Sequence, residues 1–342
     1  MRKPVSPLSL LLLLSFTRWS EAEPIYDFES PDAAILSGRS EGSLIVGGIP
    51  LQVRAGLLDA TGLFTTGGAG AILSVIPPGS IAVEPAAGGL GVDSTIDPAA
   101  ALPQALTCTP LSPSQCTDAE GLQFVIDPRF VPDTFTLRTF GDVTGLRVFA
   151  GPADTGLPRA PVSSGIGTAG SGSDVELRLY PGITSLSLGA ASGTAPAVFV
   201  ASLAGKIGVP LDIDPRSCPN SVRNKGMVHA AILGTDYFDV SQVDPASVRL
   251  VGVAARRSKL RDVATVSLPL IGKASESDCT AAGKDGFLDL GLMFNGREVI
   301  DAIEASWEED VHDGDVLIVT VEGNLFDGNS FVGEDVIVIR RK

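Results

Sequence analysis

Residues 284–294 read KDGFLDLGLMF, and this stretch decides the expected fold of the chain around it. Its Asp-Gly pair opens an apolar run that is shorter than an ordinary helix and fits a buried strand. Similar breaks recur at residues 313–315 (DGD) and 327–328 (DG), next to segments such as VLIVTV and VIVI. Apolar segments separated by Asp-Gly pairs are typical of strands joined by tight type I′ turns. The C-terminal third is therefore predicted to be β.

The same pattern of short apolar segments between turn-forming residues extends from residue 211 to the end of the chain. Seven segments there have strand patterns: LDIDP, MVHAAILGT, SVRLVGV, VATVSLPL, FLDLGLMF, VLIVTV and VIVIRR. Residues 297–305 (REVIDAIEA) are the exception, because their apolar positions fall on one short helical face. Asn295 is placed to cap that helix.

Upstream, residues 23–204 are rich in Gly, Ala, Ser, Thr and Pro, and contain short alternating runs such as SLIVGGIPLQVRA, GLQFVIDP, DTFTLRTF and AVFVASLAG. Runs of this length between turn-forming residues predict an antiparallel sandwich. A Gly- and Pro-punctuated stretch at residues 205–210 is the expected linker. The fold class is thus predicted to be all-β, with two tandem antiparallel β-sandwich domains, the first of them jelly-roll-like.

Residues 1–22 have the parts of a secretory signal peptide: a basic start at Arg2 and Lys3, an apolar run, and a small residue, Ala22, at the end. The apolar run is about half of the roughly 20 residues that a membrane helix needs, so no transmembrane anchor is expected in the mature chain. We expect a secreted protein, located in the periplasm or outside the cell. The net charge of −15 disfavours nucleic acid and anionic lipid as partners.

The chain has four cysteines, Cys108, Cys116, Cys218 and Cys279. Export makes disulfides the expected state, although four cysteines allow three pairings. The two-domain division favours Cys108 with Cys116 and Cys218 with Cys279. Neither pair has zinc spacing, and a thiol nucleophile is not expected.

Motifs for nucleotide binding and catalysis lack the surroundings that they need. Residues 165–170 (GIGTAG) match GxGxxG, but a Pro/Ser loop precedes them and a strand pattern follows in place of a helix. His229 lies in an apolar strand pattern and His312 in an acidic turn, and the chain has no HExxH motif. The sequence therefore predicts that the chain is not an enzyme. Two carboxylates acting on a polysaccharide stay open as an alternative.

Calcium binding and glycan binding have weaker support in the sequence. An EF-hand register placed on Gly286 leaves three ligand positions without an oxygen-bearing side chain, and hairpin turns explain the Asp-Gly pairs without a metal. A calcium site assembled from separated loops would draw on four acids: Asp212, Asp214, Asp285 and Asp289. Calcium is the one cofactor that this interpretation allows. A glycan platform is weakly supported, because the mature chain has few polar aromatic residues: Trp307, Tyr26, Tyr180 and Tyr237.

The strings LDIDPRSCPN, KGMVHAAILGTDYFDVSQVDPASVRL, DGFLDLGLMF and DGDVLIVTVEGNLFDGNSFVGEDVIVIR follow one another in residues 211–340. In this order they resemble a module found at the C-terminal end of many secreted bacterial proteins of undefined function. The resemblance implies an immunoglobulin-like sandwich at residues 211–342, with Cys218 and Cys279 matching the module's two cysteines, and it implies no catalytic residues. More loosely, IYDFES, GLGVDSTID and AEGLQFVIDPRF resemble the N-terminal sandwiches of exosortase-sorted (PEP-CTERM-type) surface proteins.

An exported, acidic, turn-rich β chain without a nucleophile, a base or a metal constellation predicts a non-catalytic role. We expect a binding or cell-envelope module whose partner is an unknown protein or glycan of the envelope or the exterior. Calcium-dependent adhesion, carbohydrate binding and carboxylate-dependent polysaccharide hydrolysis are the alternatives.

Overall fold

A computed structural model describes residues 24–46, 48–59, 63–67, 71–76, 89–93, 108–112, 115–140, 146–150, 160–163, 173–179, 183–190, 197–307 and 310–340. The expected signal peptide at residues 1–22 and the glycine motif at residues 165–170 lie outside these ranges. The described chain is mostly strand, which confirms the all-β class. It divides into two compact units, one of residues 24–205 and one that contains residues 206–340.

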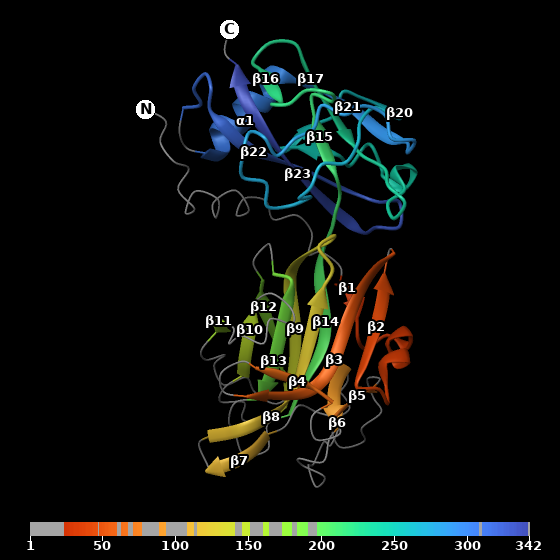
Figure 1. Cartoon of the computed structure of the whole chain (residues 1–342), viewed down its shortest axis with the longest axis vertical. Helices are drawn as coiled ribbons and strands as arrows, with labels where there is room; N and C mark the ends of the chain where they lie inside the picture. Colours follow the sequence, from red (N-terminus) through yellow and green to blue (C-terminus); the bar gives the residue numbers. More distant parts are fainter. Residues whose placement is uncertain are drawn as a thin grey trace. The chain divides into compact units, whose positions relative to one another are not determined.

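The N-terminal unit is built from strands with the following bounds: β1 Pro24–Asp27, β2 Glu41–Val46, β3 Ile49–Asp59, β4 Phe64–Thr66, β5 Ile72–Ile76, β6 Gly89–Asp93, β7 Cys108–Ser112, β8 Gln115–Ile126, β9 Phe130–Phe140, β10 Leu146–Ala150, β11 Ala160–Ser163, β12 Ser173–Arg178, β13 Ser185–Ala190 and β14 Ala197–Gly208. A short 3-10 helix, η2, spans Pro31–Leu36. One sheet has the order β11-β10-β13-β8-β3-β2, with β4 beside β3 and β7 beside β8. The other contains β12-β9-β14, with β1 and β6 beside β14 and β5 beside β6 (Figure 1).

The core of this unit lies between its two sheets. Phe124 on β8 and Phe135 on β9 come from different sheets, and their ring centroids are 5.0 Å apart in an edge-to-face contact. Phe28 packs against Phe124 in the same way at 5.7 Å. All three side chains are fully buried. The alternating runs of the sequence therefore place large apolar side chains on the two inner faces, as a sandwich requires.

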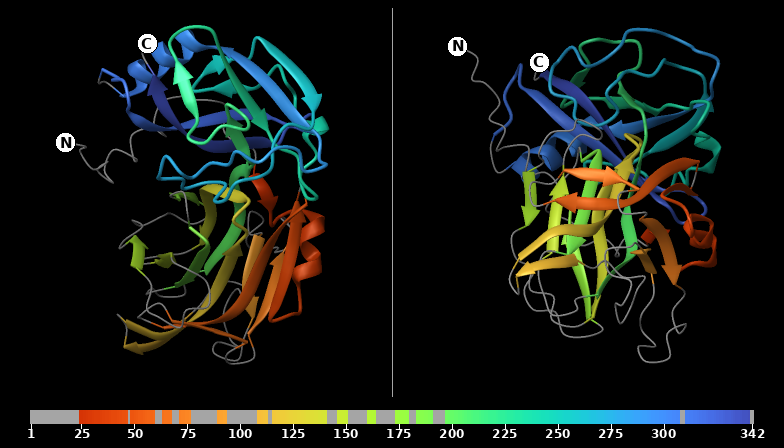
Figure 2. Two further views of the ribbon diagram at one scale, coloured as in Figure 1. Left: turned by 45° about the horizontal axis from the view of Figure 1, so that its top comes forward. Right: turned by 60° about the horizontal axis from the view of Figure 1, so that its bottom comes forward.

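The C-terminal unit consists of β15 Leu211–Ile213, β16 Ser221–Arg223, β17 Met227–Ile232, the 3-10 helix η4 Val240–Gln242, β18 Arg249–Leu250, β19 Val253–Ala254, β20 Arg257–Arg261, β21 Asp289–Asn295, helix α1 Gly296–Trp307, β22 Val316–Asn324 and β23 Ser330–Arg340. One sheet has the order β15-β17-β21-β20. In the other, β23 pairs with β22, β22 with β18 and β18 with β19. Figure 2 shows β22 and β23 as long neighbouring ribbons.

Two pairings of β23 correct the expectation of a wholly antiparallel unit. Residues 207–208 at the end of β14 pair in parallel with residues 331–332, and β16 pairs in parallel with residues 338–340. Between β14 and β16 the chain forms β15, which belongs to the other sheet. The chain then comes back to β23 as β16, running in the same direction as before, so both pairings are parallel. The division between the two units falls between residues 205 and 206, inside the expected linker of residues 205–210. β14 continues to Gly208, and Val209 and Pro210, which follow it, are buried.

The decisive stretch of the sequence contains a central strand, as predicted. β21 starts at Asp289 and lies between β17 and β20, with both pairings antiparallel. Asp289, Leu290, Leu292 and Phe294 are buried. Phe287, before the strand, is 42% exposed, so the buried part of the run begins later than its first apolar residue.

Helix α1 follows β21 directly and confirms the predicted helix. The Oδ1 atom of Asn295 accepts hydrogen bonds from the main-chain N–H groups of Arg297 at 3.0 Å and Glu298 at 3.3 Å, which caps the helix. Val299 and Ile303 are buried on its inner face. Over the described part of the chain, no helix is both long enough and apolar enough to cross a membrane.

The turn type predicted for the Asp-Gly pairs is wrong. A type I′ turn needs positive φ at both central residues, whereas at Gly286, Gly314 and Gly328 only the glycine has it, with φ of 99°, 92° and 94°. The two-residue turn with positive φ at both positions joins β18 to β19 at Val251 and Gly252. In the Asp-Gly segments, carboxylates accept nearby main-chain N–H groups, as Asp285 does from Phe287.

A second correction concerns residues 263–270, VATVSLPL, which were predicted to form a strand. They belong to a long loop, residues 262–288, that connects β20 to β21. Val263 and Ala264 pack against Ala231 and Leu233 at the end of β17. Their main-chain N–H groups donate to the side chain of Asp289 and not to the main-chain carbonyls of a strand. Val263, Ala264 and Leu270 are thus buried without strand pairing, whereas Leu268 is exposed.

Candidate functional site

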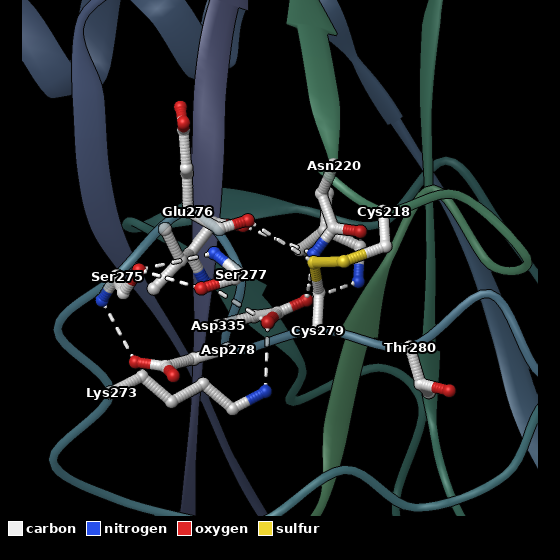
Figure 3. The surroundings of a disulfide bond; sticks show 12 residues. Cys218, Asn220, Lys273, Ser275, Glu276, Ser277, Asp278, Cys279, Thr280 and Asp335 are labelled. Atoms are coloured by element: carbon white, nitrogen blue, oxygen red, sulfur yellow. Dashed lines mark hydrogen bonds and ion pairs between the residues drawn. A yellow bond between two sulfur atoms is a disulfide. The ribbon is translucent and has the colours of Figure 1, made fainter.

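The long loop of residues 262–288 is attached to the rest of the C-terminal unit at several points. One is the disulfide between Cys218, which follows β15, and Cys279 in the loop; their Cα atoms are 5.5 Å apart (Figure 3). This confirms the predicted pairing. Cys108 and Cys116 lie on β7 and β8, which pair antiparallel, but their side chains are outside the described part, so their bond stays a prediction.

Lys273 of the loop and Asp335 of β23 form an ion pair in the interior (Figure 3). Nζ lies 2.8 Å from Oδ1 of Asp335, and the side chains are 2% and 1% exposed. Oδ1 also accepts from the N–H of Val336, whereas Oδ2 accepts from the N–H of Ile213 at 2.6 Å and from Nδ2 of Asn220 at 2.8 Å. Burial raises the pKa of Asp335, and the positive charge of Lys273 opposes this effect.

Asp212 on β15 completes this buried cluster and lacks a full set of donors. It is 4% exposed, and among the described residues its Oδ2 atom has no hydrogen-bond partner. Burial, together with the negative charge of Asp335, raises its pKa to about 7, and the positive charge of Lys273 opposes this shift. Near neutral pH Asp212 is therefore able both to give and to accept a proton.

Asp289, at the start of β21, ties two loops to the sheet. Its Oδ1 atom accepts from the N–H of Gly234 at 3.1 Å, and Oδ2 accepts from the N–H groups of Val263 at 2.6 Å and Ala264 at 3.2 Å. The side chain is fully buried. Burial raises the pKa of Asp289, while the three N–H donors lower it.

The four acids proposed for calcium are only partly brought together. Asp214 and Asp289 lie close enough to Asp212 for their negative charges to raise its pKa. Asp285 is exposed, and its Oδ1 atom accepts from the N–H of Phe287 at 3.0 Å. In the described ranges, no three or more His, Cys, Asp or Glu side chains are grouped so as to hold a metal ion. The calcium site stays a hypothesis.

Both histidines are exposed, whereas Tyr26 is buried. His229 is exposed on β17, and the imidazole of His312 is 77% exposed, 3.8 Å from Asp315. Tyr26 is fully buried in the other unit and donates its hydroxyl to the carbonyl of Ile49 at 2.9 Å. Such a residue cannot serve as a surface platform. The side chains of Trp307 and Tyr180 are outside the described part.

Sequence reasoning missed the residues at the centre of the cluster: Lys273, Asn220 and Asp335. A signal was present, because Asp335 stands inside the apolar strand pattern SFVGEDVIVIR. Acids are almost never fully buried unless paired, so an acid at an inward position of a strand indicates a buried partner. The sequence does not say which of the distant lysines or arginines that partner is.

The arrangement restricts the chemistry that these groups can perform. An amine and two carboxyl groups lie together, with exposures of 2%, 1% and 4%, so an external substrate cannot reach them without opening the fold. Their available reactions are proton exchange and reaction with one another. No protein-family model matches the chain, and no curated protein is significantly similar to it. The resemblance of residues 211–340 to a secreted bacterial module therefore stays a prediction.

Proposed function

We propose that this chain is an exported, non-catalytic module of the cell envelope or exterior that presents a rigid β surface to a protein or glycan partner. The observation that carries this proposal is the use of the buried acids in the C-terminal unit. Asp289 and Asp335 direct their oxygens at main-chain and side-chain donors of the chain itself. These hydrogen bonds connect separate segments of the chain, which favours a structural role over a catalytic one.

Three further features support an extracellular setting. The bridge Cys218–Cys279 is a bond that persists in oxidising compartments. The net charge of −15 suits a soluble exported chain. Two packed sheets in the C-terminal unit agree with the proposal of an immunoglobulin-like sandwich, an architecture that displays loops at its ends.

Cell fractionation tests the location. The full chain with a C-terminal tag is expressed in a Gram-negative host, and the same chain without residues 1–22 serves as the matched control. We expect the full chain in the periplasm or the medium, with Cys218 and Cys279 protected from alkylation. The control should stay in the cytoplasm with both thiols reactive. A full chain that stays in the cytoplasm with free thiols would overturn the proposal.

The non-catalytic role needs a separate measurement. Purified protein is incubated with isolated cell envelopes, and both sedimentation with the envelopes and release of reducing sugar ends are recorded. Sedimentation without new reducing ends is the expected result. Release of reducing ends, absent from a heat-unfolded sample, would replace the binding proposal with polysaccharide hydrolysis. Failure to sediment would exclude an envelope partner.

A further inference from the structure

We propose that Lys273 and Asp335 join through an intramolecular amide bond between Nζ and Cγ, formed inside the folded C-terminal unit, with Asp212 as the group that moves protons. The proposal does not depend on the partner or the location of the protein. It assigns a covalent modification to a pair that would otherwise be a buried salt bridge. The bond would connect the loop of residues 262–288 to β23, across 62 residues of sequence.

Proximity is the first argument. The amine nitrogen lies 2.8 Å from Oδ1 of Asp335, and both side chains are almost completely buried. Groups held at such a distance react with effective concentrations far above any in solution. The loop that carries Lys273 is fixed by the disulfide of Cys279 and by the bonds of Val263 and Ala264 to Asp289. The pair is thus preorganised by contacts outside itself.

Burial is the second argument, because it favours the reactive protonation states. In water an ammonium ion is not a nucleophile, and a carboxylate is a poor electrophile. A dry interior disfavours both charges, so transfer of one proton from Nζ to Oδ1 of Asp335 gives a neutral amine beside a neutral carboxylic acid. The attraction within a buried ion pair offsets little of the cost of removing both charges from water, so the charged pair is only weakly favoured over the neutral pair.

The donors around Asp335 are the third argument. When the lone pair of Nζ attacks Cγ, negative charge develops on Oδ2, which already accepts from the N–H of Ile213 at 2.6 Å and from Nδ2 of Asn220 at 2.8 Å. Two donors fixed on a developing oxyanion are the arrangement that stabilises tetrahedral intermediates. The leaving oxygen is Oδ1, which lies on the side of Lys273.

The atoms balance without any further reagent. One Nζ–Cγ bond forms and one Cγ–Oδ1 bond breaks. Asp212 accepts a proton from the attacking nitrogen and gives one to the departing oxygen, and it ends in its starting state. One water molecule leaves. The unpartnered, buried Oδ2 of Asp212 provides the free acceptor that this exchange needs.

Peptide mapping of the full chain tests the bond directly. The purified protein is reduced, denatured and digested with trypsin. We expect residues 262–284, uncut after Lys273, joined to residues 298–340 in a species lighter than the two peptides together by one water molecule. Separate recovery of both peptides, with cleavage after Lys273, would overturn the proposal. Residues 262–284 joined instead to residues 217–223, with loss of ammonia in place of water, would assign the bond to Asn220 and would also overturn the proposal.

Variants then test the roles. Lys273→Met should give only linear peptides, whereas Lys259→Met, a change at an exposed lysine of β20, should keep the branched species. Asp212→Asn should retain the fold by circular dichroism but yield linear peptides. A branched species at the wild-type level in Asp212→Asn would remove Asp212 from the reaction. Because the wild-type map decides the existence of the bond, a variant that fails to fold does not weaken the test.

Discussion

Replacing Asp289 by alanine should lower the free energy of unfolding of the C-terminal unit by about 4 kcal/mol. The carboxylate accepts three buried main-chain N–H groups, of Gly234, Val263 and Ala264. Each lost bond to a charged acceptor costs about 1.5 kcal/mol or more, because the donor is left unpaired away from water. Removal of the carboxylate's own desolvation cost offsets part of this sum.

Two further variants separate hydrogen bonding from other effects of the substitution. Asp289→Asn keeps one acceptor oxygen in nearly the same volume, so we expect it to lose about half as much stability, roughly 2 kcal/mol. Asp285→Ala is the matched control four residues away. Its carboxylate is exposed and accepts one N–H, from Phe287, so its loss should cost less than about 1 kcal/mol.

Guanidinium unfolding followed by tryptophan fluorescence suits this comparison, because Trp307 on α1 is the only tryptophan after residue 22. Hydrogen exchange adds local resolution, since the amides of residues 234, 263 and 264 should lose protection in Asp289→Ala before the rest of β21 does. If Asp289→Ala unfolds at the same midpoint as Asp285→Ala and keeps those three amides protected, the anchoring role of Asp289 is refuted.

Four other changes have defined outcomes. Cys218→Ser opens a bridge that spans 61 residues and should cost about 4 kcal/mol in thermal unfolding, and an unchanged melting curve would contradict this. Gly286→Val should cost about 1 to 2 kcal/mol because φ is 99°, whereas Gly283→Ala, whose added Cβ comes no closer than 3.9 Å to a neighbour, should be nearly neutral; equal effects would refute the strain argument. In Lys273→Met, which cannot form the amide bond, stability should fall by about 4 kcal/mol or more as pH rises from about 4 through 7 and above. Burial raises the pKa of Asp212 to about 7 even beside the Lys273 charge, which lowers it, so the folded variant binds the proton more tightly than the unfolded chain; a flat profile would contradict this. Millimolar calcium added after chelator should leave the melting temperature unchanged, whereas a clear upward shift would support the calcium hypothesis.

Much of the fold could be predicted because its strands are long, apolar and separated by turn formers. β21, β22 and β23 occur where the patterns placed them, and Asn295 caps α1 as expected. β20 was missed since its sequence, RSKLR, shows no apolar alternation and all five residues are exposed on an edge strand. In residues 263–270 the pattern predicts a strand that does not form, because Val263 and Ala264 are buried by loop packing without a strand partner.

The turn with positive φ at both central residues lies at a dipeptide that the sequence does not indicate. Asp-Gly is the usual signal for a type I′ turn, yet the turn with positive φ at both positions is Val251-Gly252. A β-branched residue resists positive φ, so no sequence rule would place Val251 there. The pairing of Leu250 with Val253 imposes a two-residue connection, and the surrounding sheet thereby overrides the local preference.

The buried cluster was the hardest feature to foresee, and its charges explain why. A sequence pattern counts each lysine and aspartate as solvated, yet Asp335 sits in an apolar strand, where an unpaired charge would be very costly. That cost requires a nearby cation, and only five lysines lie between residues 206 and 340. Chain topology then decides the pairing, since the disulfide at Cys279 holds the loop near β23, and a partner 62 residues away becomes a neighbour.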